Sequence, residues 1–142
     1  MLDFRTLYNQ HQVIIRLASD LTGLADTLRT RDDAIEARAL LERLDRVLCA
    51  HLELEDRTVM PALSDSEDPA TRGLAQDCIE EMGGIAQVWA AYRSAWRTET
   101  IAASPARFAC ATLNLVEALA GRVEREERQL YPLAQGPENR PA

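Results

Sequence analysis

Apolar residues recur every three or four positions along four long stretches of this chain, a spacing that lines one face of a helix. No stretch shows the alternating pattern of a β-strand. Proline and glycine are scarce between the ends of these stretches. The pattern therefore predicts an all-α protein with helices over residues 3–30, 33–60, 69–100 and 105–131.

The ends of these stretches carry helix boundary signals. Pro69 and Pro105 suit the first position of a helix, and Asp68 and Ser104 suit the N-cap position before it. Long helices joined by short loops prefer antiparallel neighbours. We therefore expect an antiparallel, up-down-up-down four-helix bundle.

The second half of the chain repeats the first half. The segment from His51 to Pro61 matches the segment from Arg122 to Pro132, at a spacing of 71 residues. One helical hairpin thus recurs as a second hairpin. Because neither hairpin can bury its apolar face alone, we expect the two to dock as a pseudo-symmetric pair.

Composition places the chain among globular domains and excludes some partners. It has 142 residues, of which 46% are apolar, and a net charge of −7 with arginine as its only basic residue type. This balance argues against nucleic acid and against an anionic membrane surface, and no apolar run is long enough for a membrane span. We expect one domain over residues 1–134 and a disordered tail over 135–142.

The three cysteines show no CxxC spacing. They predict reduced, mostly buried thiols in a cytoplasmic protein. The sequence shows no nucleophile with an adjacent base, no phosphate-binding glycine loop and no zinc-finger spacing. No catalytic residue is therefore assigned, and any enzymatic chemistry would have to come from a bound metal.

Five polar residues interrupt the apolar stripes at one level of the expected bundle: His11, His51, Glu55, Arg122 and Glu126. Burying such groups without partners costs several kcal/mol, roughly 2–7 for each polar group, so their convergence needs a common explanation. Either they bind a metal, or they form a closed ion-pair network around Arg122. His51 and Glu55 are four residues apart on one helix face, which lets both reach one ion.

At these residues the chain resembles the hemerythrin-like, or HHE cation-binding, family. The matching segments are Asn9–Ile14, His51–Pro61 and Glu126–Leu133. The resemblance implies a helical bundle with a non-haem di-iron centre held by histidines and two bridging carboxylates. Glu55 and Glu126 match the bridging carboxylates, and His11 and His51 match histidines of the first hairpin.

The second hairpin departs from the family pattern. Met82 and Arg122 stand where the pattern has histidines. With too few histidines for two irons, reversible oxygen binding is not expected. We expect the Arg122 guanidinium to replace one metal by pairing with Glu55 and Glu126.

Three outcomes follow for the site. His11, His51, Glu55 and Glu126 could hold a single non-haem iron or another divalent metal, used to sense or store a metal, oxygen or a related small molecule. The site could instead be metal-free, within a regulatory or protein-interaction bundle. A complete two-metal centre would need substitute ligands, for which the candidates are Glu81, Glu124 and Cys78. A further option is an enzyme that uses a mononuclear iron.

The third predicted helix carries two other features. Trp89, Tyr92 and Trp96 form an aromatic stripe, which we expect in the core or, alternatively, on a homodimer surface. Gly83 and Gly84 together cost roughly 2 kcal/mol of helix propensity relative to alanine. They predict a bend or break in this helix, a close helix approach, or a path for a ligand.

Overall fold

The computed structural model describes residues 2–136, and these residues form helices and no strand. The helices in chain order are α1 (Phe4–Asp26), α2 (Arg31–Ser64), α3 (Pro69–Met82), α4 (Ile85–Ala95), α5 (Thr98–Ala103), α6 (Pro105–Arg125), the π-helical turn η1 (Glu126–Leu130) and α7 (Tyr131–Gln135). The all-α class is confirmed. The expected tail begins inside α7, and residues 137–142 lie outside the described part of the chain.

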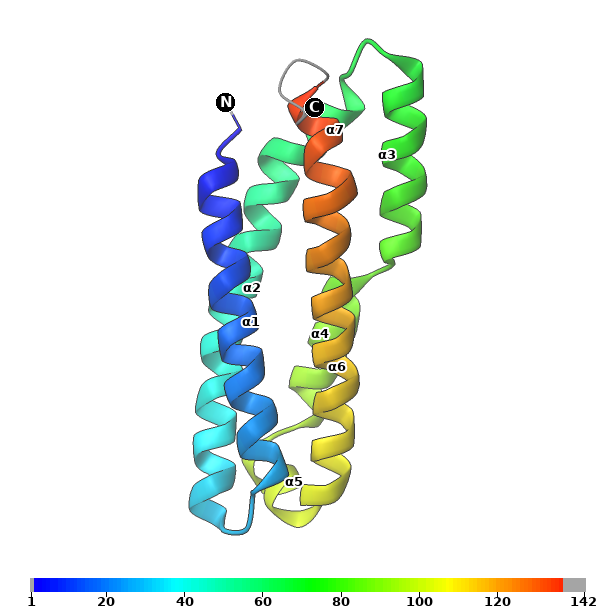
Figure 1. The fold of residues 1–142 in the computed structure, drawn as a ribbon. Helices are drawn as coiled ribbons and strands as arrows, with labels where there is room; N and C mark the ends of the chain where they lie inside the picture. Colours follow the sequence, from blue (N-terminus) through cyan, green and yellow to red (C-terminus); the bar gives the residue numbers. More distant parts are fainter. Residues whose placement is uncertain (1, 137–142) are drawn as a thin grey trace.

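Three long helical columns make the body of the molecule: α1, α2, and α6 with its continuation through η1 and α7. The α1 helix packs against both α2 and α6, which continues through η1 into α7. The α4 helix packs on α6, and α5 packs on α2 and α6. Successive long segments run in opposite directions, and both ends of the described chain lie at the same end of the molecule (Figure 1).

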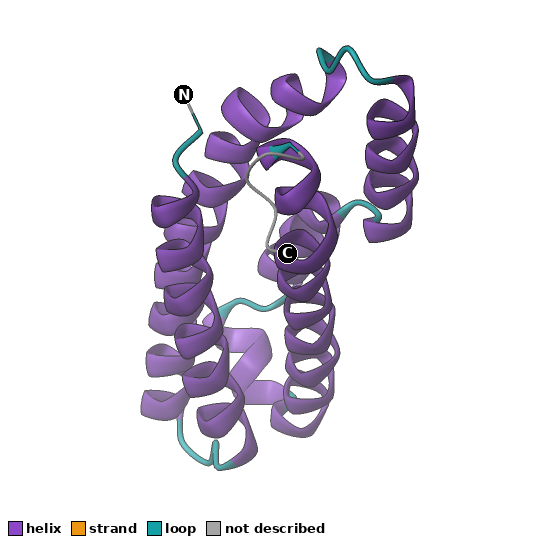
Figure 2. Ribbon diagram, turned by 45° about the horizontal axis from the view of Figure 1, so that its top comes forward, coloured by secondary structure: helices purple, strands orange, loops and turns teal. Residues whose placement is uncertain are grey.

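The predicted helix over 69–100 is divided in the structure, and the first division lies at the Gly83-Gly84 pair, where a bend or break was one of the expectations. The helix ends at Met82 and restarts at Ile85, and Gly83 between them has φ of +71°, a left-handed conformation that favours glycine. A second interruption separates α4 from α5. The α3 helix stands to one side of the long columns (Figure 2) and buries only two of its 14 residues.

The predicted end of the second helix is also corrected. The α2 helix continues past Pro61 to Ser64, and the Pro61 carbonyl still accepts a hydrogen bond from the Asp65 N–H at 2.9 Å. A proline inside a helix removes one donor but leaves its own carbonyl free to pair. At the start of α3, Asp68 accepts from the Ala70 N–H at 3.1 Å, which confirms it as the N-cap.

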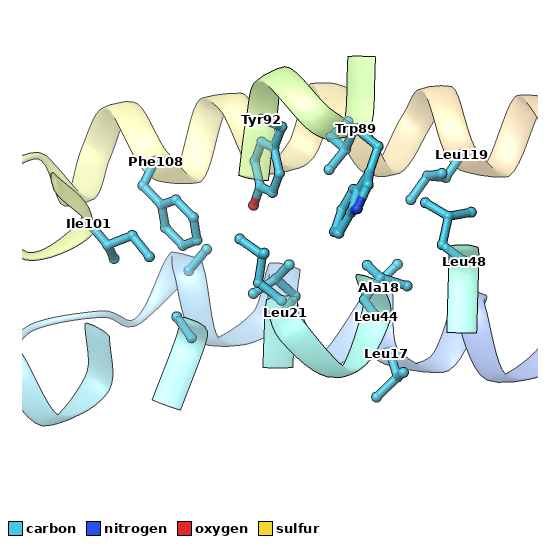
Figure 3. Packing of buried hydrophobic residues seen from close by; sticks show 14 of the residues in the cluster. Leu17, Ala18, Leu21, Leu44, Leu48, Trp89, Tyr92, Ile101, Phe108 and Leu119 are labelled. Atoms are coloured by element: carbon cyan, nitrogen blue, oxygen red, sulfur yellow. The ribbon is translucent and has the colours of Figure 1, made fainter. Parts of the chain in front are cut away.

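The main core fills the space between α1, α2, α4 and α6 (Figure 3). Trp89 and Tyr92 are 3% and 7% exposed and lie within it, and Trp96 packs against it. The indole N–H of Trp89 donates to Asp45 Oδ1 at 2.7 Å, so its polar edge is also satisfied. The expected core role of these aromatics is confirmed. Their burial within this chain argues against a homodimer surface formed by the same side chains.

Replacing Leu44 by alanine tests the main core. Its side chain is fully buried on α2, so the Leu44→Ala variant is expected to lose about 2–5 kcal/mol of unfolding free energy. Urea unfolding followed by circular dichroism measures the loss. The control is Ile35→Ala on the same helix, where the side chain is 50% exposed and the expected loss is below about 1 kcal/mol. Equal losses in both variants would contradict this assignment of the core.

The cysteine prediction is partly wrong. All three thiols are free, but Cys49 and Cys110 are exposed and Cys78 alone is buried. Cys49 and Cys110 lie on outward faces of α2 and α6, between the apolar positions that face the core. Among the described residues, no helix combines the length and apolar character needed to cross a membrane.

Candidate metal centre

Four buried side chains from three segments converge near one end of the bundle. His11 comes from α1, His51 and Glu55 from the later part of α2, and Glu126 from the start of η1. None is more than 2% exposed. One nitrogen or oxygen atom of each lies within 4.8 Å of the others. The structure therefore brings together the four residues that the sequence proposed as metal ligands.

The spacing of these atoms suits a single small ion. His11 Nε2 lies 3.1 Å from His51 Nε2, and Glu126 Oε1 lies 2.7 and 3.2 Å from these two nitrogens. Glu55 Oε2 lies 3.4 Å from His51 Nε2. Atoms bound to one first-row metal at about 2.0–2.2 Å lie roughly 3–3.5 Å from one another. These four separations are thus close to those of ligands around one metal, and all pairs of the four atoms lie within 4.8 Å.

Hydrogen bonds on the far side of each imidazole orient the two histidines. His11 Nδ1 lies 2.6 Å from Glu127 Oε2, and His51 Nδ1 lies 2.8 Å from Gln10 Oε1. A carboxylate and an amide oxygen are acceptors, so each Nδ1 carries the hydrogen and donates it. When both rings are neutral, their Nε2 lone pairs face each other at the centre. Metal-binding histidines are held in this way by their outer partners.

Arg122 lies on the opposite side of the two carboxylates. Its Nε donates to Glu126 Oε2 at 2.9 Å, and its Nη2 donates to Glu55 Oε1 at 3.4 Å. The other oxygen of each carboxylate faces the histidines. Glu55 and Glu126 therefore bridge between the histidine pair and the guanidinium of Arg122, whose side chain is 15% exposed.

Tyr131 is a site residue that the sequence did not single out. Its side chain is fully buried, and its hydroxyl donates to Glu55 Oε2 at 2.7 Å. Residues five apart lie on different faces of an α-helix, but the wider π-helical turn η1 brings Tyr131 round to the side of Glu126. The only earlier signal was the place of Tyr131 in the motif before Pro132.

Two outer partners were also missed. Glu127 is 36% exposed, and its carboxylate accepts a hydrogen bond from His11 Nδ1. Gln10 lies one position before His11 and holds the other histidine. Both contacts join different helices, so the periodicity of either helix alone does not reveal them.

The other residues proposed for the site lie outside this cluster. Met82 is half-buried and lines, together with Arg122, a groove of about 540 Å³. Glu81 pairs with Arg125, and Glu124 lies 3.4 Å from Arg128. Within residues 2–136, the grouping able to hold a metal contains neither these glutamates nor Cys78. The substitute ligands of a two-metal centre therefore receive no support.

Burial and neighbouring charges shift the pKa values at the centre. Burial lowers the pKa of His51, but the contacts with Glu126 and Glu55 outweigh it and raise this pKa to about 9. Burial favours the neutral form of Glu126, but hydrogen bonds from His11 and His51 hold its pKa well below the usual range. Burial raises the pKa of Glu55. Burial and the two carboxylates also raise the pKa of the Tyr131 phenol.

These features define a class of protein, a helical bundle with a buried cluster of histidines and carboxylates. The family model described as the hemerythrin HHE cation-binding domain matches residues 2–134. The chain belongs to this family, which confirms the resemblance seen in the sequence. Comparisons with curated proteins and with solved structures found no significant match.

Proposed function

We propose that this protein binds a single non-haem iron, or else another divalent metal ion, and serves to sense or store a metal, oxygen or a related small molecule. The ligands are His11, His51, Glu55 and Glu126. The observation that carries the proposal is the pair of Nε2 atoms 3.1 Å apart, each on a ring whose Nδ1 is held by an outer acceptor. A cation between the two Nε2 atoms would bind both lone pairs and displace the proton that His51 otherwise carries.

The donor set fits one ion and not two. Two imidazoles and two carboxylates suit iron, zinc or manganese. A second ion would have to bind the carboxylate oxygens that Arg122 contacts, beside a guanidinium that stays charged at all accessible pH values. We therefore propose that Arg122 replaces the second metal of the family's centre, and we do not propose reversible oxygen transport.

Metal content tests this proposal. Protein purified without chelators, or reconstituted with ferrous, zinc or manganese ions, is expected to hold about one ion per chain by elemental analysis. Titration of the metal-free protein should give the same stoichiometry. Substoichiometric metal that is unchanged in the His51→Ala variant would reject the proposed site.

Metal binding should strengthen as pH rises. The pKa of His51 is about 9 in the metal-free centre, so at neutral pH the metal must displace its proton. Affinity should therefore increase by about tenfold per pH unit for each proton released, between about pH 6 and pH 8. Titrations at several pH values, corrected for metal hydrolysis and buffer binding, measure this slope. An affinity independent of pH would contradict competition between the metal and the proton.

A metal-free regulatory or interaction bundle is the second candidate, and the contacts of Arg122 favour it. Together, Arg122 and a protonated His51 can neutralise Glu55 and Glu126 with no ion present. A bound metal stabilises the folded state in proportion to its affinity and concentration. An unchanged melting temperature in excess ferrous, zinc and manganese ions would support this second function.

The state of the cysteines bears on the cellular compartment. All three cysteines are free thiols, and two of them are exposed. Exposed thiols persist in reducing compartments, where disulfides are rare. We therefore propose a cytoplasmic location.

A further inference from the structure

We propose that Tyr131 is a fifth ligand of the metal ion and binds it through its phenol oxygen. This inference rests on the proposed function, because it assigns an additional ligand to the same site. It departs from a set of histidines and carboxylates alone, and it narrows the favoured ion to ferric iron.

The position of the phenol oxygen carries the inference. Tyr131 Oη lies 2.7 Å from Glu55 Oε2, 3.3 Å from Glu126 Oε1 and 3.2 Å from His11 Nε2. It thus contacts three of the four proposed ligand atoms at separations near those of atoms bound to one ion. An ion bound by those three groups would lie within reach of the phenol oxygen.

Aromatic packing holds the phenol in this position. The Tyr131 ring stacks on His11, with centroids 5.5 Å apart and planes within 9° of each other. The rings of Phe4 and Tyr8 pack against it at 5.4 and 5.6 Å. The side chain has no exposed surface. A rotation that carried the oxygen away from the centre would break these contacts.

Coordination has a simple balance of charge and protons. The phenol O–H bond breaks, its proton leaves to solvent, and a metal–oxygen bond forms with no change of oxidation state. Phenolate is a hard anionic ligand, which suits ferric iron better than zinc or ferrous iron. Glu55, Glu126 and phenolate together carry three negative charges, which offset the three positive charges of ferric iron. The positive charge of Arg122 beside ferric iron makes this third negative charge favourable.

An absorption experiment tests this ligand. Metal-free protein is loaded with ferric iron from its nitrilotriacetate complex, and excess reagent is removed. Its iron content and visible spectrum are then measured. The parent chain is expected to hold about one iron and to show the visible charge-transfer band of an iron(III)–phenolate bond, with phenolate ring modes in the resonance Raman spectrum. Reduction with dithionite should bleach the band.

Tyr131→Phe keeps the packed ring and removes only the oxygen. This variant should bind ferric iron at least about tenfold more weakly, a loss that even an outer partner of a metal ligand produces. At saturating iron it should hold the ion without the visible band. Tyr8→Phe is the matched control, since Tyr8 packs edge-on against His11 with centroids 6.3 Å apart and, among the described residues, makes no hydrogen bond to the four ligands. Its spectrum should match that of the parent.

The outcomes separate this inference from the proposed function. Iron bound by the parent without the band, or a band that survives in Tyr131→Phe, would overturn the ligand assignment and leave the metal site standing. A parent chain that takes up no iron, zinc or manganese would overturn the proposed function and the ligand assignment with it. Loss of the band in Tyr131→Phe alone supports the inference.

Discussion

Replacing His51 by alanine is expected to remove the bound metal, from about one ion per chain to near zero. The substitution deletes one of two nitrogen ligands and leaves His11 Nε2 without its neighbour at 3.1 Å. Loss of an outer partner alone weakens metal binding by about 10–100-fold, so loss of a direct ligand should exceed about 100-fold. Elemental analysis and metal titration measure the change.

Gln10→Ala gives the graded comparison for this experiment. Gln10 accepts the hydrogen bond from His51 Nδ1 at 2.8 Å but contributes no atom to the centre. Its removal should weaken metal binding by about 10–100-fold, and high metal concentration should restore full occupancy. A His51→Ala variant that retained a stoichiometric ion would show that the metal lies elsewhere.

Replacing Arg122 by methionine should have opposite effects with and without metal. In the metal-free chain, Glu55 and Glu126 lose their buried cation, and breaking such a pair costs about 3–5 kcal/mol. Protonation of Glu55, whose pKa burial already raises, limits this cost near the lower end. The variant should nevertheless bind a metal more tightly than the parent does, because a permanent positive charge beside the ion has been removed.

Thermal unfolding in chelator and in excess metal measures both effects. A loss of about 3 kcal/mol in a chain of this length lowers the melting temperature by roughly 6–12 °C. Excess metal should restore much of the lost melting temperature. Arg107→Met is the matched control, because Arg107 is an exposed arginine on the same helix, α6. A stable metal-free Arg122→Met variant, or one with weaker metal binding, would contradict the role proposed for this guanidinium.

Helical periodicity made much of this fold predictable, and the exceptions have local causes. The apolar stripes of α1, α2 and α6 give three helices close to their predicted ranges. The Gly83-Gly84 pair divided the predicted third helix, because the backbone at Gly83 turns to positive φ. Helix propensity alone left open whether that pair would bend the helix, break it or allow a close contact. The structure shows a break, after which α4 packs on α6.

By itself, the sequence determined the all-α class, the family and the five polar side chains that interrupt apolar helix faces. These properties depend on the spacing of residues along each helix, which is local. Only the tertiary structure decided that Glu127 and Gln10 orient the imidazoles, which oxygen of each carboxylate faces Arg122, and that the π-helical turn brings Tyr131 to the centre. Each of these depends on how separate segments meet, or on an extra residue in one turn. The repeating pattern of apolar residues contains neither kind of information.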